Sequence, residues 1–309
     1  MRDECVSVSE SNVPSVGFGT YQMDPEECEA ATRAALETGY RHIDTAMAYE
    51  NEAAVGRAIR DSGVPREDIF LTTKVKGYPE YLTREGFLRA AEGCLERLDT
   101  DYVDLLLVHW WFPTGDMAGV MDALNQLVDE GKVRHIGVSN FSIEQLKRAM
   151  RLSDEPIFTN QVEYHPYFDQ EKMLAFCRAN DVLLTAYSPL AQGRVVDDEV
   201  LTRIGARYGK TAAQVAIRWL VQQEGVVTIP KSATERYIRE NRDVFDFALT
   251  EREMHEIDEL EGPLLYRLNS EGGPIYEFRA FVGPLLPSGV VDAIRTVGAS
   301  ALTLTHRGR

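Results

Sequence analysis

Short apolar runs alternate with amphipathic stretches from about residue 13 to about residue 260 of the 309-residue chain. Most of the runs are continuously apolar rather than alternately apolar and polar, which is typical of parallel strands buried on both faces. The pattern therefore predicts eight buried strands separated by helices. The strands are expected at residues 15–19, 42–44, 69–73, 103–109, 133–139, 157–162, 182–188 and 226–230.

The segments between these runs carry the signals that begin and end helices. Asp24 is a typical capping residue, Pro25 favours the first helical position, and Gly39 favours the end of a helix. A helix is therefore expected between Asp24 and Gly39. Capping-box pairs predict three more helix starts, at Ser142 with Gln145, Thr211 with Gln214 and Thr250 with Glu253.

Eight strands that alternate with helices form either a closed (β/α)₈ barrel or an open doubly wound sheet. An open dinucleotide-binding sheet should show GxGxxG after its first strand, and GFGTYQ at residues 17–22 has only the first two glycines. We therefore predict an α/β fold of the (β/α)₈ TIM-barrel type over residues 1–261. Residues 262–309 are rich in glycine and proline and lose the alternation. They are expected to form a C-terminal extension that lines the barrel mouth, packs elsewhere or is partly disordered.

The composition is that of an ordinary globular protein, with 44% hydrophobic and 27% charged residues. Four scattered cysteines without CxxC spacing indicate neither a disulfide framework nor a zinc site, so a reduced, cytoplasmic setting is expected. The N-terminus shows no signal-peptide pattern, and no apolar run is long enough to span a bilayer, so no membrane partner is expected.

The net charge is −16 and the sequence pI is about 4.9, which argues against a nucleic-acid partner because such surfaces are basic. Seven of the 33 basic residues are lysine and the other 26 are arginine. An acidic, lysine-poor surface resembles that of proteins from salt-rich cytoplasm, where high salt screens self-repulsion. Under this hypothesis the unfolding temperature rises in molar KCl, and an unchanged temperature would contradict it.

Polar side chains stand where the predicted strands end, which in a (β/α)₈ barrel is the face that carries the chemistry. Taken alone, Asp44 could be a helix cap, Tyr49 a capping aromatic and His109 a satisfied core histidine. Lys74 is less ordinary, because a buried lysine needs a partner. Their convergence on one rim predicts a functional site. The full rim set is Asp44, Lys74, His109, Ser139, Asn140, Gln161, Tyr187, Ser188, Lys231 and Ser232.

Eight motifs, taken together, are similar in order and spacing to those of one known family. They are GFGTYQM, GYRHIDTAMAYENEAAVGRAI, LTTKV, DYVDLLLVHW, HIGVSNFS, NQVEYHPY, AYSPLAQG and IPKSATERYIREN. Over about residues 13 to 260 the chain resembles the aldo-keto reductase family. The resemblance implies a (β/α)₈ fold, a small-molecule carbonyl substrate, and reduction with NADPH or less often NADH, without metal. By motif, the catalytic tetrad is Asp44, Tyr49, Lys74 and His109.

The chemistry expected of this tetrad is proton transfer to a carbonyl oxygen as hydride arrives. A phenol with a pKa of about 10 donates poorly at neutral pH, and a nearby ammonium lowers that pKa. Lys74 is expected to act in this way on Tyr49, with Asp44 holding Lys74 charged and oriented. Tyr49 is then the general acid, and His109 donates a hydrogen bond that orients the carbonyl.

The resemblance also implies a coenzyme site on the loops after the strands. The residues expected at the nicotinamide carboxamide are Ser139, Asn140 and Gln161, with Tyr187 stacked on the ring. Those expected around the pyrophosphate are Ser188, Leu190 and Gln192. Those expected at the 2′-phosphate are Lys231 and Ser232, and those near adenine are Glu240 and Asn241.

One position departs from the family pattern. Members often have arginine five residues after the serine of IPKS, where this chain has Tyr237 preceded by Arg236. One residue along a helix rotates a side chain by about 100°, so Arg236 does not simply replace the missing arginine. Lys231 favours NADPH, and NADH or dual use stays open.

The substrate pocket is expected to be aromatic. The residues expected there are Tyr21, Tyr49, His109 and Trp110, with Trp111 beside them. Packing alone is an equally good explanation of either tryptophan, because aromatic side chains dominate core burial in any case. The physiological carbonyl, the favoured direction and the oligomeric state, a monomer or a weak homo-oligomer, are left open by the sequence.

Two other functions compete with this interpretation. A metal-dependent barrel hydrolase could use His42, Asp44, His109 and His165, although the histidines do not form a convincing ligand set and Lys74 would repel a cation. A non-catalytic barrel that binds the coenzyme is the second alternative, and the complete tetrad argues against it.

Overall fold

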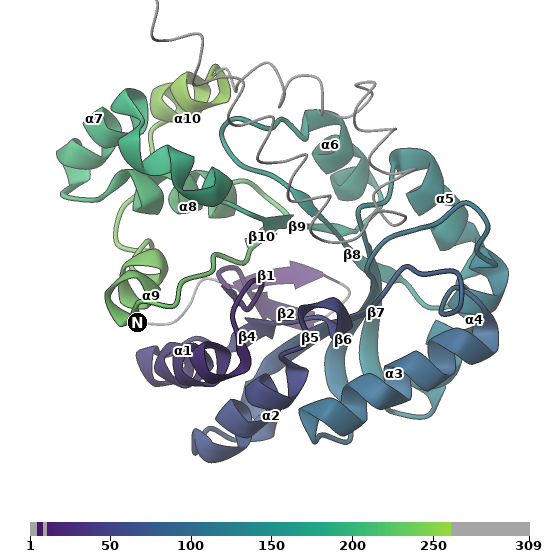
Figure 1. Cartoon of the computed structure of the whole chain (residues 1–309). Coiled ribbons are helices and arrows are strands. Elements are labelled where there is room, and N and C mark those ends of the chain that lie inside the picture. The colour runs from purple at the N-terminus through teal and green to yellow at the C-terminus, as the bar shows by residue number, and fades with distance from the viewer. Residues whose placement is uncertain (1–4, 9–10, 261–309) are drawn as a thin grey trace, which may run out of the picture.

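The structure is a computed structural model, and it describes residues 5–8 and 11–260. At its centre is a sheet of parallel strands that follow one another in chain order (Figure 1). The strands are β3 Phe18–Gly19, β4 His42–Asp44, β5 Phe70–Val75, β6 Val103–Val108, β7 Val133–Ser139, β8 Ile157–Glu163, β9 Leu183–Tyr187 and β10 Val226–Thr228.

The first and last strands of this sheet meet. Val16 forms a parallel bridge with Thr228, the Gly17 N–H donates to the Thr228 carbonyl at 2.8 Å, and the Gly19 N–H donates to the Pro230 carbonyl at 3.1 Å. These bonds close the sheet into a cylinder and confirm the predicted (β/α)₈ barrel.

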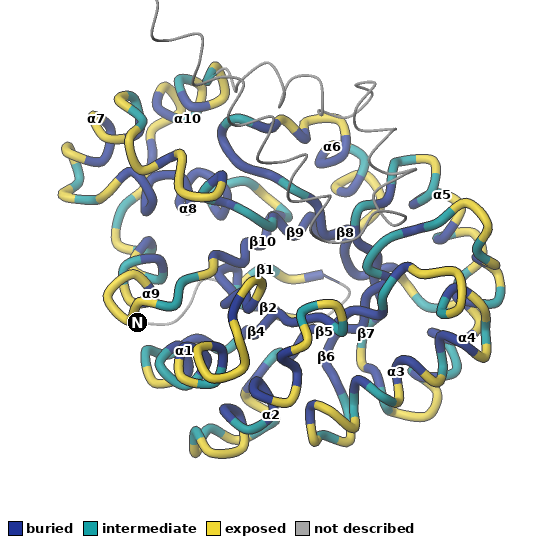
Figure 2. Tube along the Cα trace, viewed as in Figure 1, coloured by how far each residue is buried: buried dark blue, intermediate teal, exposed yellow. Residues whose placement is uncertain are grey.

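Helices surround the barrel, with their buried faces against the strands and their exposed faces outward (Figure 2). They are α1 Pro25–Thr38, α2 Glu52–Asp61, α3 Arg84–Leu98, α4 Met117–Asp129, α5 Ile143–Leu152, α6 Glu171–Ala179, α7 Glu199–Tyr208, α8 Ala212–Val221, α9 Glu235–Arg242 and α10 Glu251–Asp258. The predicted caps are confirmed: the Asp24 side chain accepts from the Glu27 N–H, and Gly39 adopts a φ of 102°. The three predicted capping boxes are present at α5, α8 and α10.

A hairpin that the sequence pattern did not predict precedes the barrel. Its strands, β1 Cys5–Val8 and β2 Ser11–Pro14, pair antiparallel. Val8 and Val13 pack against a small apolar cluster inside the barrel that includes Phe158 and Leu183, near the starts of their strands. The hairpin therefore closes the N-terminal end of the barrel and leaves chemistry to the other end.

Several predicted strand ends are wrong by one to three residues. Pairing stops early where the rim residues leave extended geometry: Ser188 adopts a φ of 51°, and Pro230 has no N–H to donate. The expected C-terminal extension at 262–309 lies outside the described residues. Within the described ranges, no helix has the length and apolar character needed to cross a membrane.

Candidate active site

The centre of the rim is a buried ion pair between neighbouring strands. Asp44 ends β4, and Lys74 lies near the end of β5; both side chains are fully buried. The Lys74 Nζ donates to Asp44 Oδ1 at 2.5 Å and to the Thr45 carbonyl at 2.8 Å. Burial lowers the pKa of Lys74 below its usual value, while the Asp44 charge opposes that shift. Because an unpaired buried charge is costly, these contacts fix the position of the ammonium.

Tyr49 stands at the end of a 3₁₀ turn, Met47–Tyr49, between β4 and α2. Its hydroxyl oxygen lies 3.4 Å from the Lys74 Nζ. Asn51 anchors the turn: its Nδ2 donates to the Thr20 carbonyl at 2.9 Å, and its Oδ1 accepts from the Thr45 hydroxyl at 3.1 Å. The anchoring roles of Asn51 and Thr45 were missed from the sequence, although both lie inside the motif that contains Tyr49.

His109 follows β6 directly and faces the phenol. Its ring lies 5.7 Å from the Tyr49 ring in an edge-on arrangement, and Tyr21 lies 5.0 Å from Tyr49 on another side. Burial lowers the pKa of His109 well below its usual value, and the charges of Lys74 and Lys76 lower it further. The imidazole is therefore neutral at neutral pH. Its buried Nδ1 has no hydrogen-bond partner among the described residues.

The residues expected at the carboxamide are joined to the ion pair. The Gln161 Nε2 donates to Asp44 Oδ2 at 2.8 Å, so both carboxylate oxygens of Asp44 are occupied. The Ser139 hydroxyl donates to the Gln161 carbonyl at 2.9 Å. Gln161 Oε1 makes no hydrogen bond within the described residues, and it can therefore accept one from a ligand.

Asn140 links the same network to two further rim residues. Its Nδ2 donates to the His109 carbonyl at 3.1 Å and to the Ser139 hydroxyl at 2.9 Å, and its Oδ1 accepts from the Tyr187 hydroxyl at 2.9 Å. Asn140 has a φ of 60°, in the left-handed region that asparagine tolerates better than most residues. The rim from His109 to Tyr187 is therefore one connected polar surface.

The loop after β9 contains the three residues expected at the pyrophosphate. Ser188 and Gln192 have φ values of 51° and 56°, and Gly193 follows with 90°. Leu190 lies between them and its carbonyl accepts from the Gly193 N–H at 2.8 Å. Non-glycine residues in the left-handed region are strained, and such strain gathers at ligand-binding loops.

The residues expected at the 2′-phosphate and adenine lie in a separate segment after β10. Lys231 is exposed, and the Ser232 hydroxyl accepts from the Thr234 N–H at 3.1 Å. Glu240, on α9, accepts from the Thr211 hydroxyl at 2.8 Å, and Asn241 beside it is buried. Within the described part of the chain, none of these residues forms a hydrogen bond with the tetrad.

Arg236 and Tyr237, where the chain departs from the family pattern, have loosely held side chains. Arg236 is 80% exposed and lies 4.0 Å from a Glu240 oxygen, and Tyr237 is half-exposed. A groove of about 710 Å³ runs between α8 and α9 beside them. It is lined by Thr211, Gln214, Glu235, Arg236, Arg239, Glu240 and Asp243.

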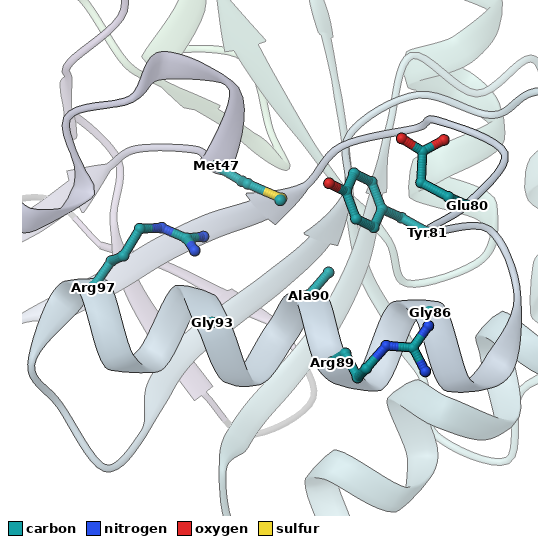
Figure 3. A pocket seen from close by; sticks show the side chains of 8 residues that line it. All are labelled: Met47, Glu80, Tyr81, Gly86, Arg89, Ala90, Gly93 and Arg97. Atoms are coloured by element: carbon teal, nitrogen blue, oxygen red, sulfur yellow. The ribbon is translucent and has the colours of Figure 1, made fainter.

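A cavity of about 270 Å³ lies between the turn that carries Tyr49 and α3. Figure 3 shows Met47, Tyr81 and Arg97 around this space, above Gly93 on the helix. Arg97 also forms an ion pair with the buried Glu52, whose other oxygen accepts from the Thr73 hydroxyl at 2.5 Å. The turn is therefore secured by polar contacts from Thr45 and Asn51 and is not closely packed by α3 on this side.

Potential metal ligands do not gather anywhere in the described part of the chain. No group of three or more histidine, cysteine, aspartate or glutamate side chains there could hold a metal ion. Instead, the rim brings together a buried ion pair, a phenol and a neutral imidazole. That combination can hold and transfer a proton.

Comparison with known proteins gives a consistent result. The model of the aldo/keto reductase family matches residues 15–261. The glyoxal reductase of Bacillus subtilis (strain 168) is 43% identical over 250 residues, which cover 80% of this chain and 89% of that protein. The 9,11-endoperoxide prostaglandin H2 reductase of Trypanosoma cruzi (strain CL Brener) is 43% identical over 265 residues, covering 83% and 91%. A solved structure described as a putative 2,5-diketo-D-gluconic acid reductase B is 50% identical, with a TM-score of 0.82, covering 85% and 92%.

Proposed function

The chain belongs to the aldo/keto reductase family, whose members reduce carbonyl groups, and from that premise we propose that Tyr49 is the proton donor of this reaction. The observation that carries the proposal is the 3.4 Å separation between the Lys74 Nζ and the Tyr49 hydroxyl oxygen. An ammonium has three N–H bonds, and Lys74 has three acceptors: Asp44, the Thr45 carbonyl and Tyr49. The adjacent Asp44 carboxylate favours the charged form and opposes the effect of burial.

The charged Lys74 makes the Tyr49 hydroxyl a workable acid. A positive charge within hydrogen-bonding distance stabilises the phenolate and lowers the pKa of the phenol toward the working pH. Tyr49 can then protonate the oxygen of a carbonyl during reduction and take the proton back during oxidation. Asp44 acts through Lys74, since it holds the ammonium charged and directed at the phenol.

His109 is assigned to the orientation of the carbonyl. Its depressed pKa keeps the imidazole neutral, so it is not a strong acid that would compete with Tyr49. A neutral imidazole donates one hydrogen bond, and a donor beside the phenol can hold the carbonyl oxygen where negative charge develops. Tyr21 and Trp110 flank this position and form the apolar wall for the substrate.

A nicotinamide coenzyme fits the donors and acceptors of the rim. The free Gln161 Oε1 can accept from a carboxamide N–H, and the half-buried Tyr187 ring offers a flat surface beside Asn140. When bound, a reduced nicotinamide supplies the hydride. We assign NADPH as the preferred coenzyme because Lys231 is an exposed cation after β10, with NADH as the alternative because Tyr237 occupies the position of an arginine.

The proposed substrate class rests on the names of the similar proteins. Small aldehydes, α-keto aldehydes and keto-sugars fit, in line with a glyoxal reductase and a putative diketogluconic acid reductase among the similar proteins. We further propose a cytoplasmic enzyme that acts as a monomer or weak homo-oligomer. Cys28 and Cys94 form no disulfide within the described residues, as expected in a reducing compartment.

The test is an absorbance assay at the nicotinamide band over a panel of carbonyls, with NADPH and NADH in parallel. Wild-type protein is expected to oxidise NADPH with at least one small aldehyde. Tyr49→Phe, which keeps the ring and removes the proton, should lower kcat by about a hundredfold to ten-thousandfold. Thermal unfolding of the variant serves as the control for folding. Near-normal turnover by Tyr49→Phe would show that the proton comes from another group.

A further inference from the structure

Lys76 is a second lysine on the rim, and the tetrad does not use it. Lys76 lies two residues beyond Lys74, and its Nζ is 3.8 Å from an oxygen of Glu50, the residue that follows Tyr49. Lys74 is directed into the catalytic centre. Lys76 therefore stands one step further toward the open end of the barrel, just past the end of β5.

Close backbone contacts hold Lys76 beside His109. The His109 N–H donates to the Val75 carbonyl at 3.0 Å. At Gly77, a Cβ atom would lie only 2.1 Å from the Trp110 carbonyl oxygen, so the two chain segments are in tight contact and only glycine fits. The charge of Lys76 is felt at the imidazole, where it helps to lower the pKa of His109. Lys76 thus has a fixed backbone position next to the group that faces the carbonyl.

The charge of Lys76 is only weakly neutralised. Its Nζ lies 3.8 Å from Glu50 Oε1 and makes no other ion pair within the described residues. The Lys76 side chain is 21% exposed, whereas that of Glu50 is 82% exposed. Exposed carboxylates in such pairs contribute little, because water and salt screen them. The nearby Lys74, in contrast, is fully paired with Asp44.

We propose that Lys76 makes this site selective for carbonyl compounds that carry a carboxylate, namely oxo acids, over neutral carbonyls of the same shape. The inference rests on the proposed function and extends it to the charge of the substrate. A substrate carboxylate replaces Glu50 at the Lys76 ammonium while the carbonyl lies against Tyr49 and His109. The aromatic wall of Tyr21 and Trp110 accepts the body of the substrate. Because this contact forms in the ground state and persists in the transition state, it acts on KM more than on kcat.

The experiment compares two aldehydes that differ only in charge, 4-formylbenzoate and 4-formylbenzamide. The ratio of their kcat/KM values is measured for wild-type protein, Lys76→Met and Lys76→Arg. We expect Lys76→Met to lower the ratio by about tenfold, mainly through KM of the benzoate, and Lys76→Arg to keep it. Lys147→Met is the matched control, since it removes the same charge from an exposed pair with Glu144 on α5.

The outcomes separate this inference from the proposed function. An unchanged ratio in Lys76→Met, or an equal fall in Lys147→Met, overturns the role of Lys76 while reduction of both aldehydes leaves the proposed function in place. If wild-type protein turns over no carbonyl of the panel, the proposed function fails. The preference for the charged aldehyde can then still be tested by measuring the binding of the two aldehydes through tryptophan fluorescence. Tighter binding of the benzoate to wild type than to Lys76→Met supports the inference, and equal binding refutes it.

Discussion

The rim contains two polar regions that are built in opposite ways. Around Lys74, the charged groups are fully buried, and the Lys74 ammonium and both carboxylate oxygens of Asp44 have hydrogen-bond partners. Around α9, the charged groups are exposed, as in the pair of Arg239 with Glu235, whose side chains are 60% and 64% exposed. A buried charge tolerates only one arrangement because any other leaves it unpaired, whereas an exposed charge loses little when its partner moves away.

The buried region contains the proposed catalytic groups, whereas the exposed region contains the residues proposed to bind the far end of the coenzyme. Lys74, which we propose makes Tyr49 acidic, is already in place in the fold, so the energy of binding is not needed to assemble this pair. The exposed side chains of α9, at the far end of the proposed coenzyme site, have only solvent-exposed partners, and their contribution should therefore depend on salt. Substitutions in the buried region should therefore have large effects that do not depend on salt concentration. Substitutions in the exposed region should have small effects that do depend on it.

The largest effect is expected from Asp44→Asn. The substitution leaves the Lys74 ammonium buried without its counter-charge, which costs about 3–5 kcal/mol of unfolding free energy in comparable pairs. Lys74 also loses its protonated form more readily, so the acidity of Tyr49 and hence kcat should fall together with stability. Urea unfolding and steady-state kinetics at pH 7 measure the two effects.

Two variants serve as controls for Asp44→Asn. Glu235→Gln breaks the exposed pair on α9 and should change the unfolding free energy by less than about 1 kcal/mol. Asp44→Asn combined with Lys74→Met removes both charges and should recover part of the lost stability without recovering activity. A loss for Asp44→Asn no larger than that for Glu235→Gln would remove the contrast between the two regions.

An intermediate effect is expected from pH, through His42 on β4. Burial lowers the pKa of His42 to about 4, whereas an unfolded histidine titrates at about 6.5. Below pH 6.5 the unfolded chain binds the proton and the folded chain does not. The stability contributed by the neutral His42 is therefore lost as pH falls from 6.5 toward 4, by up to about 1.4 kcal/mol per pH unit. His109, whose pKa is also depressed, adds to the loss over the same range.

Urea unfolding at pH 7, 6 and 5 measures this slope. His42→Gln should reduce the slope of unfolding free energy against pH by the contribution of one histidine, because it removes one titrating group. If His42→Gln leaves the slope unchanged, burial of His42 is not the cause of the pH dependence.

The sequence predicted the barrel and the rim residues for a physical reason. Parallel strands buried on both faces produce apolar runs, and polar residues that end such runs, such as Asp44 and His109, stand out against them. The β1–β2 hairpin was missed because its strands have four residues each and face the barrel interior on one side only. The roles of Asn51 and Thr45 were missed because they depend on the hydrogen bond of Thr45 to Asn51 across the turn and on that of Asn51 to the distant Thr20 carbonyl, which no local pattern reports.

The smallest effect is expected from Tyr237→Arg, which adds a positive charge after β10 at the position where the family resemblance leads us to expect one. The side chain is half-exposed, so a new contact with a 2′-phosphate is screened and strengthens NADPH binding by up to about fivefold at low salt. NADH lacks this phosphate and should bind as before. Fluorescence titrations with both coenzymes, at low salt and in 0.5 M KCl, measure the effect, and the gain should shrink at the higher salt.

Tyr237→Leu is the matched variant, because it removes the ring without adding a charge. If Tyr237→Arg strengthens NADPH and NADH equally, the added arginine acts on a part that the two coenzymes share, and the assignment of this segment to the 2′-phosphate is wrong. If the gain for NADPH persists undiminished in KCl, the contact is buried and α9 is not the loosely held region described above. A selective, salt-sensitive gain supports a coenzyme site whose far end becomes ordered on binding, beside a catalytic centre that is assembled beforehand.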